Sequence, residues 1–419
     1  MTDINPTILE MGKKASVASL KLATVDGKTR QTGLLLMKEK LLSIKEELMA
    51  VNAEDVIRAE EAGLSGPMLK RLKISEKVFN YMLNRLEGVA ALDDPVGRVL
   101  EGHVGPDGLI VQKLSVPIGV IAIIYESRPN VTTDAASVCL KSGNAVILRG
   151  GSEAKGTNLL IAESMREALK EARLPEDCVQ IIKDSDHNLV SDMLAMDQYI
   201  DLVIPRGGKE LIKRIAQGTS IPVLKHYEGI CHQYIAEDAR SDWAVDIVVN
   251  SKCQSVEVCN ALESALIHQK AAETILPLLG EALTDRGVEI RGCERVCQIL
   301  KNALPAQEED WGTEYLAPIL SIKIVDSLDE AANHINTWGS GHTDGIITQS
   351  LDKSRRFVSL VNSASVLVNA STRLSGGGAY GLGAVVGIST DKLHARGPVG
   401  PSDLTTYKWV AYGEGHIRR

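Results

Sequence analysis

From Pro117 onward, short apolar runs rich in β-branched residues alternate with stretches in which apolar residues recur every three or four positions. The apolar runs span 118–125, 144–148, 179–182 and 200–204, and the helical patterns span 131–140, 153–171, 188–196 and 208–216. Continuous apolar runs are typical of strands buried on both faces, and their alternation with helices indicates a parallel, doubly wound sheet. We expect ligands to bind near the carboxyl ends of its strands.

A second set of strand-like runs follows Cys259. These runs span 265–268, 288–290, 319–325, 345–348 and 366–369, with helical patterns between them. At 419 residues the chain is too long for one small core. The sequence therefore predicts an α/β fold with two doubly wound domains and with Cys259 in the cleft between them.

The first ninety residues contain helical patterns only. The apolar residues from Leu34 to Val51 recur at spacings of three and four, which predicts one long helix. The segment 63–67 interrupts this pattern, and 74–86 resumes it. A Gly-Pro-Asp-Gly turn at 105–108 then separates the strand-like runs 99–104 and 109–114, which predicts a β-hairpin.

Cys259 is followed by Asn260, Ala261 and an apolar periodicity that includes Leu262 and Leu266. This pattern places the thiol where a loop meets the start of a helix. The amide groups and positive dipole of a helix N-terminus lower the pKa of a thiol, and the thiolate is the nucleophilic form. A nucleophile is therefore one interpretation of Cys259, and a buried core cysteine is the alternative.

Composition and charge exclude several classes of function. The net charge is -8, and no stretch holds more basic residues than an ordinary solvent-exposed helix face does. We therefore expect no nucleic-acid partner. The 7 cysteines form no Cys-x-x-Cys pattern, and no zinc-type pair of histidines accompanies them, so neither disulfides nor a metal site are expected. The sequence shows no membrane-spanning run and no signal peptide, which predicts a cytoplasmic protein.

Glycines at 376, 378 and 381 formally match the G-x-G-x-x-G pattern of dinucleotide-binding turns. That motif requires a helix that opens on its last glycine, and the sequence at 384–388 is not helical. We therefore expect a loop that packs close to substrate or backbone.

Five stretches are specific enough to identify a family. They are 124–132 (IYESRPNVT), 142–151 (SGNAVILRGG), 203–208 (VIPRGG), 368–373 (VNASTR) and 392–398 (KLHARGP). Together with Cys259 and the two α/β sets, they resemble the aldehyde dehydrogenase superfamily and, more closely, its γ-glutamyl phosphate reductase family. One departure is the segment 252–256, which reads KCQSV where the family has KTQRP.

The resemblance implies NADPH-dependent reduction of L-glutamyl 5-phosphate to L-glutamate 5-semialdehyde and phosphate, a small-molecule reaction of proline biosynthesis. Cys259 would attack the acyl phosphate, and hydride from the nicotinamide would reduce the resulting thioester. Asn130 and the backbone amide of Cys259 would donate to the oxyanion. A helix N-cap is the alternative role for Asn130.

The resemblance also implies a set of ligand-binding residues. Those for the cofactor are Arg149, Gly150, Gly151, Ser152, Arg206, Gly207, Gly208 and Glu314. Glycines let the backbone approach a pyrophosphate, arginine suits a ribose 2′-phosphate, and Glu314 would hold the nicotinamide ribose. The alternative for the two Arg-Gly-Gly turns is a plain turn with a solvated arginine, and the alternative for Glu314 is an ordinary exposed acid. The substrate-binding candidates are Arg128, Ser371 and Arg373, together with Glu126 and the loop 376–378.

The predicted domains are a nucleotide-binding domain (1–98 and 115–252), a catalytic domain (253–397) and a small β arm (99–114 and 398–419). The resemblance implies that the arm joins chains into a homo-oligomer and suggests glutamate 5-kinase as a partner. A hydrolytic aldehyde dehydrogenase acting on a small semialdehyde is the rival function. Such an enzyme carries a glutamate base, and here Lys225 or His226 falls at that position.

Overall fold

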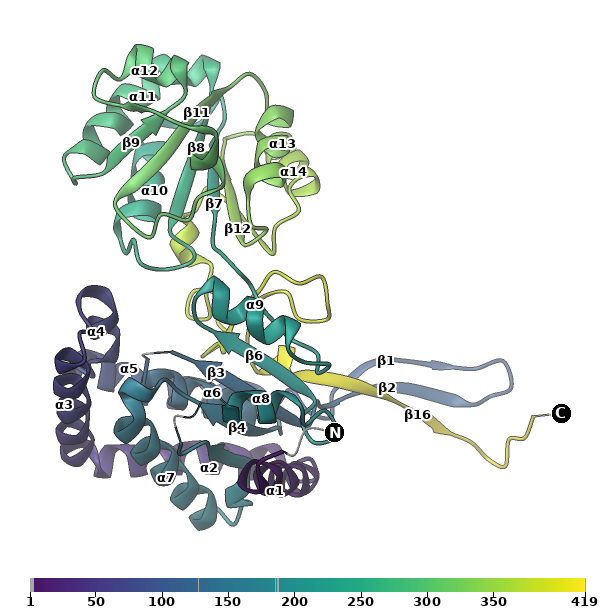
Figure 1. Ribbon diagram of the computed structural model, residues 1–419. Helices are drawn as coiled ribbons and strands as arrows, with labels where there is room; N and C mark the ends of the chain where they lie inside the picture. Colours follow the sequence, from purple (N-terminus) through teal and green to yellow (C-terminus); the bar gives the residue numbers. More distant parts are fainter. Residues whose placement is uncertain (1–3, 127, 185, 187, 419) are drawn as a thin grey trace. The chain divides into compact units, whose positions relative to one another are not determined.

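The computed structural model describes residues 4–126, 128–184, 186 and 188–418. The chain divides into two compact units, and Figure 1 shows its path. The first unit is made of 1–225, 381–387 and 399–419. The second unit is made of 226–380 and 388–398.

The sheet of the first unit is parallel. Its strand order is β5 (Val179–Ile181), β4 (Ala145–Arg149), β3 (Val120–Tyr125) and β6 (Leu202–Arg206). The helices that follow the strands are α6 (Asn130–Lys141), α7 (Lys155–Glu171), α8 (Asn188–Leu194) and α9 (Lys209–Gln217). Strands β3 and β4 are buried along their whole length, in agreement with their continuous apolar runs. The doubly wound sheet predicted for this part of the chain is confirmed.

The N-terminal helices are α1 (Pro6–Leu22), α2 (Gly27–Ser43), α3 (Lys45–Glu61), α4 (Gly66–Leu72) and α5 (Glu76–Ala91). The prediction of one long helix was wrong, because the backbone leaves the helical conformation at Ile44 (φ -98°, ψ 12°). Leu41 and Leu48 are nevertheless both fully buried. Spacings of three and four residues keep an apolar stripe on one side of a helix. Both α2 and α3 pack on α7, and α2 also packs on α5 and α6 whereas α3 also packs on α4, a difference that the spacing does not show.

The predicted hairpin is confirmed, and it belongs to a small antiparallel sheet of the first unit. Strand β1 (Val99–Val104) pairs with β2 (Ile110–Pro117), and β2 pairs on its other side with β16 (Thr405–Tyr412). This sheet extends away from the rest of the unit (Figure 1). We call it the arm sheet. Its outer strands, β1 and β16, each have one edge that pairs with no other described strand.

The sheet of the second unit is also parallel. Its strand order is β10 (Leu304–Pro305), β9 (Glu289–Gly292), β11 (Ile319–Val325), β8 (Leu262–His268), β7 (Cys231–Ile235), β12 (Thr343–Ile347) and β13 (Ser365–Val368). Helices α10 (Ser241–Cys253), α11 (Gln269–Thr284) and α12 (Glu294–Ile299) pack on one face, and α13 (Leu328–Trp338) and α14 (Leu351–Leu360) pack on the other (Figure 1). The second α/β set predicted from the sequence is thus confirmed.

The domain boundary predicted at 252 differs from the structural boundary at 226. The difference arises from β7, which was not predicted because His232 and Gln233 interrupt its apolar pattern; both are fully buried. Strand β7 pairs with β8 and β12, so it brings the segment from 226 onward, including α10, into the second unit.

Short elements complete the described chain. They are the 3-10 helices η1 (Ser152–Ala154), η2 (Glu176–Cys178), η3 (Glu308–Gly312), η4 (Thr372–Leu374) and η5 (Pro401–Leu404), and the paired strands β14 (Gly387–Ser389) and β15 (Gly397–Val399). Within the described residues, no helix is both long enough and apolar enough to cross a membrane.

Candidate active site

Cys259 lies in a turn between the end of α10 and the start of β8. The predicted helix start after the thiol was wrong, because Leu262 and Leu266 lie on the buried strand β8. A helix dipole therefore cannot account for a reactive thiol at this position. The core-cysteine alternative is also not met, because Cys259 is only partly buried.

Two histidines flank the thiol instead. The sulfur of Cys259 and one ring nitrogen each of His226 and His342 all lie within 4.8 Å of one another. Burial raises the pKa of the Cys259 thiol, but the charge and hydrogen bonding of His342 and His226 outweigh this effect and hold the pKa well below its ordinary value. The arrangement favours a thiolate, as a nucleophilic cysteine requires.

Hydrogen bonds to the far side of each imidazole orient the two rings. His226 Nδ1 lies 2.8 Å from the carbonyl oxygen of Ile388, so Nδ1 carries the proton that this oxygen accepts. His342 Nδ1 lies 2.8 Å from the hydroxyl of Thr343, which itself donates to Ser375 at 2.9 Å. The Thr343 oxygen therefore accepts from His342 Nδ1. In both neutral rings the lone pair is left on Nε2.

The loop that carries His226 packs against the backbone of Cys259. A Cβ atom on Gly229 would lie 1.7 Å from the carbonyl oxygen of Cys259, so only glycine fits there. The Gly229 N–H donates to Glu314 Oε1 at 2.9 Å, and the Ile230 N–H donates to Ser340 at 2.9 Å. Burial raises the pKa of Glu314. Glu314 thus fixes this loop, in addition to the cofactor role predicted for it.

A buried ion pair joins the two elements on either side of the turn that holds Cys259. Lys252 Nζ on α10 lies 2.6 Å from Glu263 Oε2 on β8, and both side chains are buried. The Leu316 N–H points at the other oxygen of Glu263, at 3.4 Å. Burial raises the pKa of Glu263 to about 7, even though Lys252 opposes the shift. The pair therefore connects α10 and β8 with the segment that holds Glu314.

The two substrate candidates in the second unit differ in availability. Ser371 is buried, accepts a hydrogen bond from Ser251 at 3.1 Å and caps η4 through the Arg373 N–H, so its hydroxyl serves the fold. Arg373 donates through Nε to Gln254 at 2.8 Å, and its guanidinium lies close enough to Cys259 to interact with it electrostatically. Burial lowers the pKa of Arg373. Of the two, Arg373 is better placed to meet an anionic substrate.

The glycine loop is anchored next to the thiol. The Asn260 side chain donates to the Ser375 carbonyl at 2.8 Å, directly before this loop. A Cβ atom on Gly376 or Gly378 would meet no described atom within 4 Å, so neither glycine is required by neighbouring protein atoms. Residues 382–388 contain no helix, as expected from the sequence, so the loop does not meet the requirement of a dinucleotide-binding turn.

In the first unit, a pocket lies at the carboxyl ends of β4 and β5. Gly150, Gly151 and Ser152 line it, together with Lys155 and Lys183, which the sequence analysis did not single out. A Cβ atom on Gly150 would lie 3.1 Å from the ring of Tyr125 and 2.2 Å from the amide of Asn158, so this turn is closely packed. The pocket adjoins the N-terminal end of α7, where backbone N–H groups favour a phosphate.

The two predicted arginines have partners within the first unit. Arg149 is buried and donates to the Gly150 carbonyl at 2.9 Å. Arg206 donates to the Val386 carbonyl at 2.5 Å. In the second Arg-Gly-Gly turn, the Gly208 N–H already donates to the Glu126 carboxylate at 3.2 Å. Arg206, Gly207 and Gly208 do not line the pocket of the first turn.

Asn130 is the first residue of α6, and Pro129 occupies the N-cap position, so the N-cap alternative was wrong. The Asn130 side chain hydrogen-bonds to Asp134, whose pKa burial raises to about 6. Arg128 is half-buried just before this helix. Both residues belong to the first unit.

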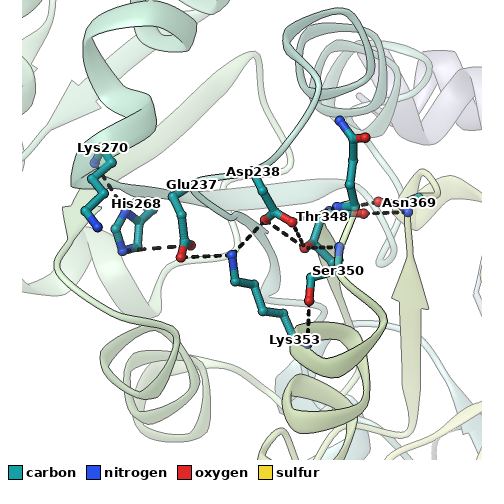
Figure 2. Close-up of polar contacts among 9 residues, drawn as sticks. Glu237, Asp238, His268, Lys270, Thr348, Ser350, Lys353 and Asn369 are labelled. Carbon is teal, nitrogen blue, oxygen red and sulfur yellow. Dashed lines mark hydrogen bonds and ion pairs between the residues drawn. The ribbon is translucent and has the colours of Figure 1, made fainter.

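A second polar cluster occupies the opposite end of the second sheet (Figure 2). Lys353 lies 2.8 Å from Glu237 and 3.1 Å from Asp238, which also accepts from Thr348 at 2.9 Å. His268 ends β8, whose 7 residues span about 20 Å from the thiol side. Lys353 bridges the two carboxylates, and we assign the cluster a structural role.

Comparison with known proteins identifies the class of this enzyme-like site. The sequence pattern of the aldehyde dehydrogenase family matches residues 8–290, and the chain belongs to this family. The chain is 46% identical over 407 residues to the γ-glutamyl phosphate reductase of Caldanaerobacter subterraneus subsp. tengcongensis, covering 97% of this chain and 98% of that protein.

Solved structures agree with this assignment. The γ-glutamyl phosphate reductase of Thermotoga maritima is 43% identical and superposes with a TM-score of 0.95, over 98% of this chain and 100% of that chain. The γ-glutamyl phosphate reductase of Saccharomyces cerevisiae is 30% identical with a TM-score of 0.55, over 99% of each chain. The fold and the resemblance inferred from the sequence are confirmed.

Proposed function

We propose that this chain reduces L-glutamyl 5-phosphate with NADPH to L-glutamate 5-semialdehyde and phosphate, as the names of its relatives indicate for those proteins. The observation that carries the proposal for this chain is the position of the Cys259 sulfur beside ring nitrogens of His342 and His226, which lowers the pKa of the thiol. The rival function, a hydrolytic aldehyde dehydrogenase, lacks support at the position of its glutamate base, where this chain has Lys225 and His226.

In the proposed reaction, the Cys259 thiolate attacks the acyl carbon of the substrate, and the bond from that carbon to the phosphate oxygen breaks. Phosphate leaves and a thioester remains. When bound, a nicotinamide cofactor would supply the hydride that reduces the thioester carbon. The carbon–sulfur bond then breaks, which releases the aldehyde and regenerates the thiolate. Nε2 of either His226 or His342 takes the single thiol proton, and Asn130 and the Cys259 N–H are the proposed donors to the oxyanion.

Aldehyde dehydrogenases act with nicotinamide cofactors, and we propose NADPH for this chain. The pocket that Gly150, Gly151 and Ser152 line would take the phosphates, with Lys155 and Lys183 as the exposed cations. Arg149 and Arg206 remain candidates for the 2′-phosphate, although each already donates to a backbone carbonyl. Glu314 has a second carboxylate oxygen with which to accept from the ribose.

We further propose that Arg373 binds the anionic end of the substrate, because it lies near Cys259 and no described acceptor pairs with its Nη atoms. Arg128 and Ser371 are weaker candidates, and Ser371 has its hydroxyl engaged in the fold.

Assembly through the arm sheet is part of the proposal. Leu100, Val104, Trp409 and Tyr412 are all more than half exposed on this sheet, and β1 and β16 present open edges. Exposed apolar side chains and open edges favour pairing with a second copy. We propose that the chain forms a homo-oligomer through this sheet. We also propose that it acts in the reducing cytoplasm, where free thiols persist. Glutamate 5-kinase, the source of the acyl phosphate, is the proposed partner.

The testing experiment measures NADP+ reduction with L-glutamate 5-semialdehyde, with and without inorganic phosphate. Dependence on phosphate or arsenate is expected, because Lys225 or His226 stands where a hydrolytic aldehyde dehydrogenase carries the glutamate that activates water. Rapid formation of free glutamate in phosphate-free buffer would instead establish the hydrolytic enzyme.

A further inference from the structure

Cys259, His226 and His342 offer one donor atom each to a common point. Their donor atoms lie within 4.8 Å of one another, and all three belong to the second unit. One thiolate and two imidazoles are a donor set that Zn²⁺ prefers. The sequence alone predicts no metal site, because its cysteines form no Cys-x-x-Cys pattern and no zinc-type pair of histidines accompanies them; His226 and His342 stand 33 and 83 positions from Cys259.

The two imidazoles are already oriented as metal ligands. A histidine that binds zinc through one nitrogen usually donates its other N–H to a carbonyl, hydroxyl or carboxylate. His226 Nδ1 donates to the Ile388 carbonyl at 2.8 Å, and His342 Nδ1 donates to Thr343 at 2.8 Å. His342 is fully buried, and its Nε2 makes no hydrogen bond to any described oxygen or nitrogen atom.

The spacing and local charge also suit a zinc ion. With bonds of about 2.0 Å to nitrogen and about 2.3 Å to sulfur, donors around tetrahedral zinc are roughly 3.3–3.6 Å apart. Small rotations of partly buried side chains bring the three donors from at most 4.8 Å to that range. Glu314 and Arg373, which both interact electrostatically with Cys259, offset each other in charge.

We propose that Cys259, His226 and His342 bind one Zn²⁺ ion and that zinc thereby blocks the thiol reversibly. The thiol loses its proton to solvent and a sulfur–zinc bond forms, so no redox change occurs. Zinc withdraws negative charge from the sulfur and stands beside it, so the sulfur becomes a weaker and less accessible nucleophile toward an acyl carbon. The fourth zinc position is left for water. The site therefore makes free zinc an inhibitor that a chelator removes.

The experiment uses the full chain, freed of metal with a chelator and titrated with Zn²⁺ alone by calorimetry. One Zn²⁺ per chain is expected. Thr343→Val removes only the partner of His342 Nδ1 and should weaken binding by roughly 10–100-fold. Cys259→Ala should weaken binding further. His103→Gln on the exposed strand β1 and Cys253→Ser on α10 are matched controls that should keep the wild-type affinity.

Cobalt gives a readout that does not depend on variants or on catalysis. Co²⁺ bound at this site should show a thiolate-to-cobalt charge-transfer band, which alkylation of Cys259 should abolish. Absence of binding, absence of this band, or undiminished zinc binding by Cys259→Ala would overturn the proposal. Because neither measurement uses substrate or nucleotide, the result is independent of the reductase activity.

Discussion

Replacement of Gly229 by alanine should disable the thiol with little effect elsewhere. The added Cβ would lie 1.7 Å from the Cys259 carbonyl oxygen and 2.7 Å from its Cα. Ordinary contacts begin at 3.4 Å, so one of the two backbones must move by about 1.7 Å. The φ angle of Gly229 is not in the left-handed region, and the effect is therefore steric.

The displacement falls on the loop that carries His226 and donates to Glu314. Because misplacement by about 1 Å can cost 10²-fold in rate, kcat should fall by at least about 100-fold. Overpacking costs about 1–3 kcal/mol, which for a unit of this size lowers Tm by about 2–12 °C. The alkylation rate of Cys259 by iodoacetamide at neutral pH should fall as well, because the thiol loses a histidine neighbour.

The assays are reductase activity, thermal unfolding and mass-spectrometric alkylation of the Cys259 peptide. Gly208→Ala is the matched control for folding and alkylation, since its Cβ would meet no described atom within 4 Å. Wild-type alkylation and kcat in Gly229→Ala, with an unchanged Tm, would refute the reasoning from the close contact.

Four further outcomes are expected. Cys259→Ser should retain its fold but lose nearly all turnover, whereas Cys253→Ser should remain active; activity assays on both variants decide which thiol reacts. With a chelator present, alkylation of Cys259 should stay fast through neutral pH and slow only when acid protonates the thiolate, because its pKa is lowered; Cys253, whose pKa burial raises, should react only at alkaline pH. Lys155→Ala and Arg149→Ala should raise KM for NADPH more than for NADH, by an amount equivalent to roughly 1.5–3 kcal/mol for a charge-assisted contact; equal changes in both KM values would exclude contact with the 2′-phosphate. Deletion of the residues after Leu404 removes β16 and should lower the oligomer mass measured by light scattering or make the chain insoluble; a monomeric wild type would contradict the role of the arm sheet.

Strand and helix periodicity was sufficient for most of the fold. Runs such as Val120–Tyr125 are buried on both faces, so their composition reports their environment directly. The prediction failed where a buried strand carries polar side chains. His232 and Gln233 are fully buried on β7, and the apolar pattern that identifies a strand is missing there. It failed again at Ile44, because amphipathic spacing is the same in one long helix and in two helices that share a face.

The environment of the thiol was predicted less well than the thiol itself. The residues at 258–262 suggest a helix start, yet Leu262 and Leu266 lie on strand β8. Every residue of this strand is buried, so its sequence contains apolar residues four positions apart, the same spacing that a helix shows. The low pKa of Cys259 has a different cause, namely His342 and His226. Neither histidine lies near Cys259 in the sequence, and no local pattern relates them.

The order of the strands explains why these three residues meet. Cys259 precedes β8, His226 precedes β7 and His342 directly precedes β12. In the sheet, β7 lies between β8 and β12, and all three strands are parallel. The amino ends of neighbouring parallel strands lie at the same edge of a sheet. The residues that directly precede these three strands are therefore neighbours, which brings the thiol and both imidazoles together.

The cluster around Lys353 lies at the carboxyl ends of the same strands (Figure 2). In the first unit the predicted cofactor turn lies at the carboxyl ends of the strands, as expected for a doubly wound sheet, whereas in the second unit Cys259 and its two histidines lie at the amino ends. Periodicity shows which residues precede a strand, but it does not encode the strand order that makes these three strands neighbours.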